Sequence, residues 1–125
     1  MNVVDSSAWL EYFADGPNAG RFAPIVQTTE ELLVPTIVLL EVTRRIHQQR
    51  GEDAALQAAA VLHQGTIVDL NSALALAAAH IGVAEKLPLA DSVVLATARQ
   101  HQATLWTMDS DFEGVRGVRY FPKQK

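Results

Sequence analysis

The sequence predicts an α/β fold in which a parallel β-sheet is sandwiched between helices. Short apolar runs alternate with longer helical patterns along the whole chain, and turn residues separate the two kinds of segment. Several apolar runs also stop at an acidic residue, as buried strands do when they deliver side chains to one edge of a sheet. Strands that alternate with helices form right-handed crossovers, and such crossovers produce a parallel sheet.

The first half of the chain is expected to form two strands and four helices. Trp9 and Phe13 share one face of the first helix, and Gly51 ends the third helix. Pro24 lacks a backbone donor and is therefore expected to disturb the middle of the second helix. The expected strands cover residues 2–5 and 32–34, and the expected helices cover residues 7–14, 19–28, 36–49 and 52–64.

The second half is expected to form three strands and two helices. Asn71 or Ser72 is a suitable cap for the first of these helices. Pro88 stands at the first position of the next helix, where its missing donor is harmless. The expected helices cover residues 72–86 and 88–102, and the expected strands cover residues 66–70, 104–107 and 118–121.

The composition indicates one domain covering residues 1–125, which is long enough to bury a core without disulfides. The absence of cysteine excludes disulfides, a thiol nucleophile and a cysteine zinc site. No apolar run reaches the ~18 residues of a membrane span, and the N-terminus lacks the basic region of a signal peptide. We therefore expect a cytoplasmic protein. The net charge of −4 counts against nucleic-acid binding unless clustered acids hold cations.

Four acids stand out because their neighbours are apolar. Asp5 ends the first strand and Asp109 ends the fourth, whereas Glu41 and Asp91 lie within helices that are apolar around most of their circumference. A helix that is apolar all round is buried, so a carboxylate within it needs a partner.

Each of these acids also has a purely structural interpretation. Asp5 is placed to cap the first helix, and Asp91 lies in a first helical turn, where the helix dipole favours negative charge. Asp109 and Asp111 are ordinary turn residues. Glu41 has arginines three and four residues further along its helix.

A shared function explains the four acids together. If the first and fourth strands are neighbours, Asp5 and Asp109 emerge side by side, and Glu41 lies one turn into a helix that starts at the same edge. The residues alone leave open at which edge Asp91 lies. Like charges ~4 Å apart repel by roughly 4 kcal/mol at an effective dielectric near 20. Such a cluster needs a cation, and hard oxygen ligands favour Mg²⁺ or Mn²⁺ over zinc.

The same residues carry a family resemblance that spans nearly the whole chain. The chain resembles the PIN-domain ribonucleases, and within them the VapC-type toxins of bacterial toxin–antitoxin pairs. The matching segments are 4–7 (Val-Asp-Ser-Ser), 35–36 (Pro-Thr) leading to Glu41, 89–92 (Leu-Ala-Asp-Ser), and 105–112 (Leu-Trp-Thr-Met-Asp-Ser-Asp-Phe).

The resemblance implies a five-stranded parallel sheet in the order 3-2-1-4-5, with Asp91 at the same edge as the other acids. It assigns catalysis to the acidic quartet Asp5, Glu41, Asp91 and Asp109. Asp5, Asp109 and Asp91 are expected to bind the metal directly, whereas Glu41 acts through a water. Auxiliary roles fall on Ser6, Thr107 and Asp111.

The activity implied is Mg²⁺- or Mn²⁺-dependent endoribonuclease cleavage of RNA by a toxin with a cognate antitoxin. A homodimer or a toxin–antitoxin hetero-oligomer is expected. Arg44, Arg45 and Arg116 are candidate RNA contacts, although solvated surface charge is an equally good interpretation of each.

Two other readings remain open. One is a housekeeping PIN nuclease that processes RNA without an antitoxin. The other is a non-catalytic acidic α/β module. A phosphoacceptor receiver domain would need an acidic pair after the first strand and a late lysine, whereas Asp5 is followed by two serines and residues 107–112 contain no lysine. A dehalogenase-like phosphatase would need its Asp-x-Asp after the first strand, whereas that spacing occurs here at Asp109 and Asp111.

Overall fold

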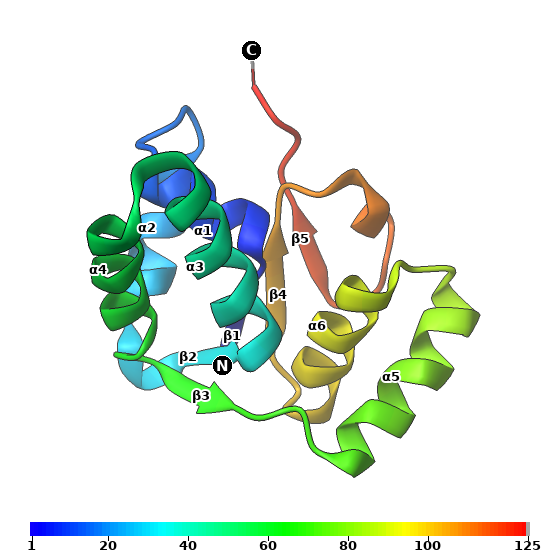
Figure 1. Cartoon of the computed structure of the whole chain (residues 1–125). Coiled ribbons are helices and arrows are strands. Elements are labelled where there is room, and N and C mark those ends of the chain that lie inside the picture. The colour runs from blue at the N-terminus through cyan, green and yellow to red at the C-terminus, as the bar shows by residue number, and fades with distance from the viewer. Residues whose placement is uncertain (125) are drawn as a thin grey trace.

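The computed structural model describes residues 1–124 and contains a five-stranded parallel sheet in the order β3-β2-β1-β4-β5 (Figure 1). The predicted fold class and strand order are therefore confirmed. The strands are β1 (Asn2–Val4), β2 (Leu32–Pro35), β3 (Thr66–Val68), β4 (Thr104–Thr107) and β5 (Val118–Tyr120). The central pair, β1 and β4, places Val3 beside Leu105 and Val4 beside Trp106.

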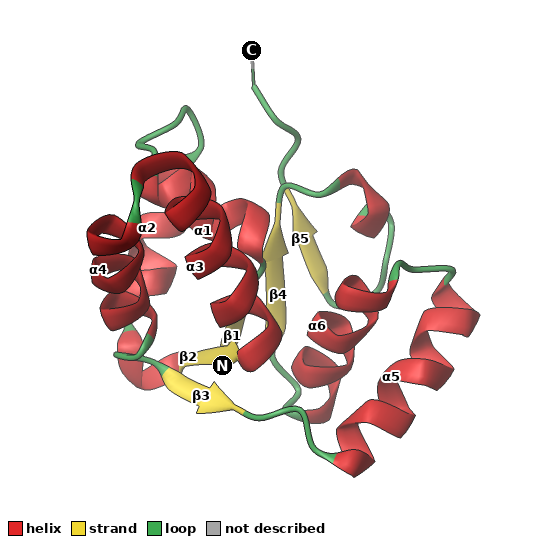
Figure 2. Cartoon of the chain, in the orientation of Figure 1, coloured by secondary structure: helices red, strands yellow, loops and turns green. Residues whose placement is uncertain are grey.

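Helices occupy the connections between the strands (Figure 2). The α-helices are α1 (Ser6–Phe13), α2 (Ala19–Gln27), α3 (Thr36–Arg50), α4 (Glu52–Leu62), α5 (Ser72–Glu85) and α6 (Leu89–Gln100). Two short 3₁₀ turns were not predicted, η1 (Thr29–Glu31) and η2 (Ser110–Phe112). Three-residue turns of this kind carry no hydrophobic period, so the sequence pattern cannot reveal them.

Pro24 does not interrupt α2, which continues through it to Gln27. The carbonyl that Pro24 leaves without its helical donor belongs to Gly20, and Gly20 is exposed. Water can therefore replace the missing hydrogen bond, and the buried side of the helix, which includes Phe22, packs normally.

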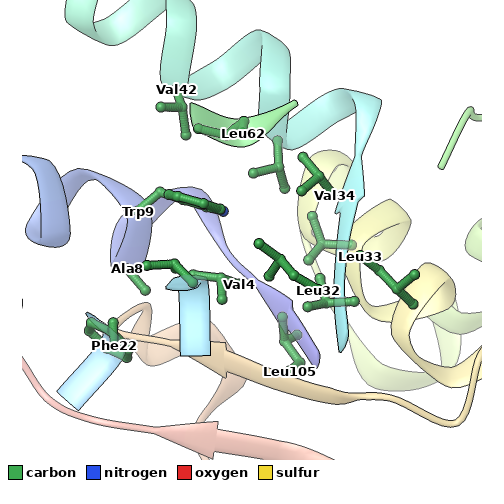
Figure 3. Close-up of a cluster of buried hydrophobic side chains, with 14 of the residues drawn as sticks. Val4, Ala8, Trp9, Phe22, Leu32, Leu33, Val34, Val42, Leu62 and Leu105 are labelled. Atoms are coloured by element: carbon green, nitrogen blue, oxygen red, sulfur yellow. The ribbon is translucent and has the colours of Figure 1, made fainter. Parts of the chain in front are cut away.

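The core forms where the strands meet α1, α3 and α4 (Figure 3). Val4, Trp9, Val42 and Leu62 are fully buried there, although they come from four different elements. Trp9 also stacks on Phe13 with 5.7 Å between ring centroids. Because Trp9 of α1 and Val42 of α3 belong to the same core, α1 packs directly against α3, and the two segments that follow β1 and β2 are fixed relative to each other.

Helix α5 lies at the outside of the molecule and packs on α6 (Figure 1). It leaves Leu76 72% exposed and Val83 82% exposed, and Leu89 at the start of α6 is 87% exposed. Within residues 1–124, no single helix is long and apolar enough to cross a membrane. Helices α5 and α6 together have the length and composition of a membrane span, but the pair is bent by 111°.

Candidate active site

The carboxyl edge of the sheet collects the segments that carry the acids. Helix α1 begins directly after β1, α3 begins directly after β2, and the loop after β4 leads into η2. Figure 1 shows the turn between α5 and α6 beside this loop, so α6 begins at the same edge. The acids predicted from the sequence therefore approach one another from four separate elements.

Asp5 lies at the bottom of the site and is only 2% exposed. Its Oδ2 accepts a hydrogen bond of 2.9 Å from the Thr107 hydroxyl and one of 3.0 Å from the Ser7 hydroxyl. Burial raises the pKa of Asp5 above its usual value, and the two hydroxyl hydrogen bonds offset part of that rise. Asp5 occupies the N-cap position of α1 but makes no side-chain capping bond, so capping does not explain this residue.

Ser7 and Thr107 form a small polar network with the backbone of the β4 loop. The Ser7 hydroxyl accepts a hydrogen bond from the Met108 amide, and the Thr107 hydroxyl accepts one from the Asp109 amide. The two hydroxyls lie 3.3 Å apart. The network therefore fixes the Asp5 carboxylate and the start of the Asp109 loop together.

Asp91, Asp109 and Asp111 form the group of carboxylates that could hold a metal ion. One oxygen from each lies within 4.8 Å of the other two. Asp109 is also a turn residue, because its Oδ1 accepts a hydrogen bond of 2.9 Å from the Asp111 amide at the start of η2. The structural interpretation of Asp109 is thus correct, and the same turn brings Asp111 into the group.

The pKa of Asp91 is raised to about 7, chiefly by burial and then by the charges of four nearby carboxylates, in the order Asp5, Asp109, Asp111 and Glu41. Asp91 lies in the first turn of α6, where the helix dipole would lower its pKa. The raised value shows that the dipole is outweighed by burial and by the other acids. The location in a first helical turn is therefore only part of the account of Asp91.

Glu41 faces the same region from α3. Burial raises the pKa of Glu41, the charges of Asp5 and Asp109 raise it further, and a hydrogen bond from the Ser6 hydroxyl partly offsets these effects. The expected alternative, an ion pair with a nearby arginine of α3, is not formed within residues 1–124, where the one ion pair joins Arg99 to Glu85.

The donor set suits a hard divalent cation. Two oxygens on opposite sides of Mg²⁺ lie about 4.2 Å apart, because each Mg–O distance is about 2.1 Å. The three carboxylate oxygens all lie within 4.8 Å of one another, so the group is compact enough to share one ion, and the carboxylates of Asp109 and Asp111 come from a surface turn. Carboxylate oxygens favour Mg²⁺ or Mn²⁺ over zinc, and all four histidines are exposed and outside the group.

Of the remaining predicted residues, some lie beside the acids and one lies at the other edge of the sheet. Thr107 is fully buried against Asp5, and Arg44 and Arg45 line a hollow that also contains Ser6 and Glu41. Arg116 lies at the opposite edge, because the Gly117 carbonyl next to it accepts from the Leu105 amide at the start of β4. Arg116 is therefore not brought to the acids.

Ser7 was missed by the sequence analysis. Its partners Thr107 and Met108 are about one hundred residues away in the chain, separated by 100 and 101 positions. Two signals were available, its place in the matching segment 4–7 and a hydroxyl two residues after an acidic strand end, but such serines are common at helix starts.

Comparison with known families decides the identity of the fold. The model of the PIN domain family matches residues 3–118. The chain belongs to the PIN domain family. Among curated proteins, no match was found.

Solved structures similar to this PIN domain include a toxin–antitoxin complex and a toxin. A toxin–antitoxin complex from Klebsiella pneumoniae matches with a TM-score of 0.81 and 22% identity, over 98% of this chain and 99% of that one. VapC20 of Mycobacterium tuberculosis, described as a toxin that cleaves the sarcin–ricin loop, matches with a TM-score of 0.77 and 19% identity, over 94% and 97% of the two chains. DNA-bound VapBC of Salmonella typhimurium matches with a TM-score of 0.71 and 14% identity, over 98% and 97%.

Proposed function

We propose that this PIN domain is a cytoplasmic Mg²⁺- or Mn²⁺-dependent endoribonuclease that acts as the toxin of a toxin–antitoxin pair. The observation that carries the proposal is the carboxylate group of Asp91, Asp109 and Asp111 at the carboxyl edge of a PIN-domain sheet. Asp5 and Glu41 lie close enough for their charges to raise the pKa of Asp91. Five acids thus act on one small region, which is unfavourable without a cation.

The chain's own residues have distinct roles in this proposal. Asp91, Asp109 and Asp111 hold the cation, and Asp5 lies behind them in a fixed orientation because two hydroxyls donate to it. Glu41 lines the adjoining hollow, so it is placed to take a proton from an attacking water. When bound, the divalent cation supplies electrostatic stabilisation of the phosphate and lowers the pKa of a coordinated water.

The metal-ligand set proposed here combines the sequence prediction with the observed geometry. The sequence favoured Asp5 with Asp91 and Asp109, whereas the structure groups Asp111 with the last two. Asp5 is almost fully buried and already accepts two hydroxyl hydrogen bonds. We therefore expect substitution of Asp5 to abolish activity mainly by disordering the site, and substitution of Asp91 to abolish metal binding itself.

The test is incubation of the purified protein with total RNA in Mg²⁺, in Mn²⁺ and in EDTA, followed by sequencing of the new RNA ends. Asp5→Asn and Asp91→Asn are compared with Asp69→Asn, an exposed aspartate after β3. We expect metal-dependent cleavage by the wild type and by Asp69→Asn, and none by the other two. If all four proteins leave the same RNA ends and calorimetry detects no metal binding, the proposal that the protein is a nuclease is contradicted.

The toxin role has its own support and its own test. The similar structures are toxin–antitoxin complexes or toxins. We expect a short neighbouring reading frame to encode an antitoxin that forms a complex with this chain and suppresses cleavage. A nuclease without such a neighbour would instead be a housekeeping RNA-processing enzyme.

The proposal includes self-association, as a homodimer or within the hetero-oligomer. The surface that supports it is an apolar groove of about 480 Å³ between α5 and α6, bordered by the exposed Val83 and Leu89. Light scattering of the purified protein, alone and with the antitoxin, measures the assembly directly.

A further inference from the structure

A groove leads away from the acidic site between α1 and α3. It consists of two hollows, of about 410 and 320 Å³, that meet at Leu10 and Arg45. The first hollow contains Ser6 and Glu41, and the second contains Ser7. Both hollows therefore open beside the polar network that holds Asp5.

Three cations border this groove and are available to a ligand. Arg44 lines the first hollow, Lys123 lines the second, and Arg45 lines both. All three residues are exposed. In the part of the chain that the structure describes, the one ion pair lies elsewhere, between α5 and α6, so none of the three cations is neutralised by an acidic partner.

The acid within the second hollow is already engaged. Glu11 lines that hollow, and its carboxylate accepts a hydrogen bond of 2.8 Å from the backbone amide of Asn18. Glu11 keeps its charge, but away from Glu41 it is the one acid that lines the groove beside three cations, so the groove is positive although the net charge of the whole chain is −4. A positively charged groove on a protein of negative net charge favours the binding of an anionic ligand there.

We infer that the groove holds a single strand of RNA on one side of the scissile phosphate, with Arg45 bound to the next backbone phosphate. The inference rests on the proposed nuclease function and specifies how its substrate lies. The volume of each hollow falls within the range of sites that hold one small molecule, about 300–1,000 Å³. Each hollow therefore accommodates about one nucleotide.

Arg45 is singled out by its position between the two hollows. Two successive nucleotides are joined by one phosphodiester, and Arg45 is the cation common to both hollows. The apolar side chain of Leu10 also lines both hollows. Leu40, which is 58% exposed, lines the first hollow. These leucines offer contact for an unpaired base, which suits a single strand better than a closed duplex.

The test compares Arg45→Gln with Arg45→Lys and with Arg116→Gln. Arg116 is a matched control because it is an exposed arginine at the opposite edge of the sheet, and the hydrogen bond from Arg99 goes to its backbone carbonyl, which the substitution keeps. Binding of a fluorescently labelled single-stranded oligouridylate is measured in EDTA at several salt concentrations. Cleavage of a uridine dinucleotide and of longer oligouridylates is then measured in Mn²⁺.

We expect Arg45→Gln to weaken binding about fivefold to tenfold and to lower the slope of log affinity against log salt by about 0.7, the value for one phosphate contact in a single strand. Arg45→Lys retains most of the affinity, because lysine also binds a phosphate as a point charge. For longer strands Arg45→Gln raises KM and leaves kcat nearly unchanged, whereas cleavage of the dinucleotide is unaffected.

The outcomes separate this inference from the proposed function. Loss of binding in Arg45→Gln but not in Arg116→Gln supports the groove, even if no cleavage occurs and the nuclease proposal fails. Equal binding by all variants, or equal loss in both glutamine variants, overturns it while wild-type cleavage can still succeed. Weakened binding of an antitoxin with unchanged RNA binding also overturns it, because the groove would then hold protein.

Discussion

Replacing Asp91 with asparagine should stabilise the metal-free protein at neutral pH. In the folded state the pKa of Asp91 is raised from an ordinary value of 3.8 to about 7, chiefly by burial and then by the other acids. The folded state therefore holds a proton that the unfolded state has released. The contribution of Asp91 to stability is complete below pH ~4 and is lost as the pH rises to about 7.

The size of the effect follows from the same shift. A change from 3.8 to about 7 corresponds to about 4 kcal/mol if nothing screens the charge. Asp91 is only partly buried, so solvent reduces this figure, and we expect roughly 1–2 kcal/mol. For a domain of this size, that corresponds to a difference in Tm of about 3–8 °C.

The assay is thermal unfolding of the wild type, Asp91→Asn and Asp69→Asn in EDTA across a pH series from acidic to mildly alkaline. The three proteins should have similar Tm values at the acidic end, and Asp91→Asn should become the most stable as the pH rises. Added Mg²⁺ should raise the Tm of the wild type and of Asp69→Asn but not that of Asp91→Asn. If Asp91→Asn is no more stable than the wild type at neutral pH in EDTA, burial and the neighbouring acids do not raise the pKa of Asp91 as argued.

Two further substitutions probe the packing around the site. Thr107→Val should destabilise the protein by about 1–3 kcal/mol in chemical denaturation, because the buried Asp5 carboxylate and the Asp109 amide both lose their hydrogen bond to the Thr107 hydroxyl. Thr107→Ser keeps the hydroxyl and should retain most of the stability. Equal losses in the two variants would show that the hydroxyl is not the cause. Gly82→Ala should cost about 1–3 kcal/mol, because a Cβ at Gly82 would lie 2.3 Å from the Ser92 hydroxyl oxygen. In a Ser92→Ala background the cost should be smaller, because the Cβ of residue 92, 3.1 Å away, is then the closest remaining atom. An unchanged cost there would show that the hydroxyl is not the obstacle.

Much of the fold and part of the site can be predicted from local sequence. Residues 2–5 and 104–107 are apolar runs that stop at or just before acids, and burial in a parallel sheet requires that pattern. The same pattern places Asp5 and Asp109 at strand ends. The helices follow from their apolar spacing and their caps, as the Asn71 side chain shows by accepting a hydrogen bond from the Leu74 amide.

The grouping of side chains at the site could not be predicted in the same way. Asp111 joins Asp91 because a short 3₁₀ turn follows β4, and a three-residue turn leaves no periodic signal. Arg45 and Arg116 look alike in the sequence, yet they lie at opposite edges of the sheet, and only strand order and direction distinguish them.

Local sequence thus accounts for where the strands end and which of them carry acids, because backbone propensity and burial act over a few residues. The hydroxyl network around Asp5 depends on contacts between Ser7 and the Thr107–Met108 segment, about one hundred positions further along the chain. Such contacts arise only when β1 and β4 pair and α1 packs through Trp9 against the core. Hydrogen-bond geometry at that scale is set by packing in three dimensions, and no short-range pattern in the chain encodes it.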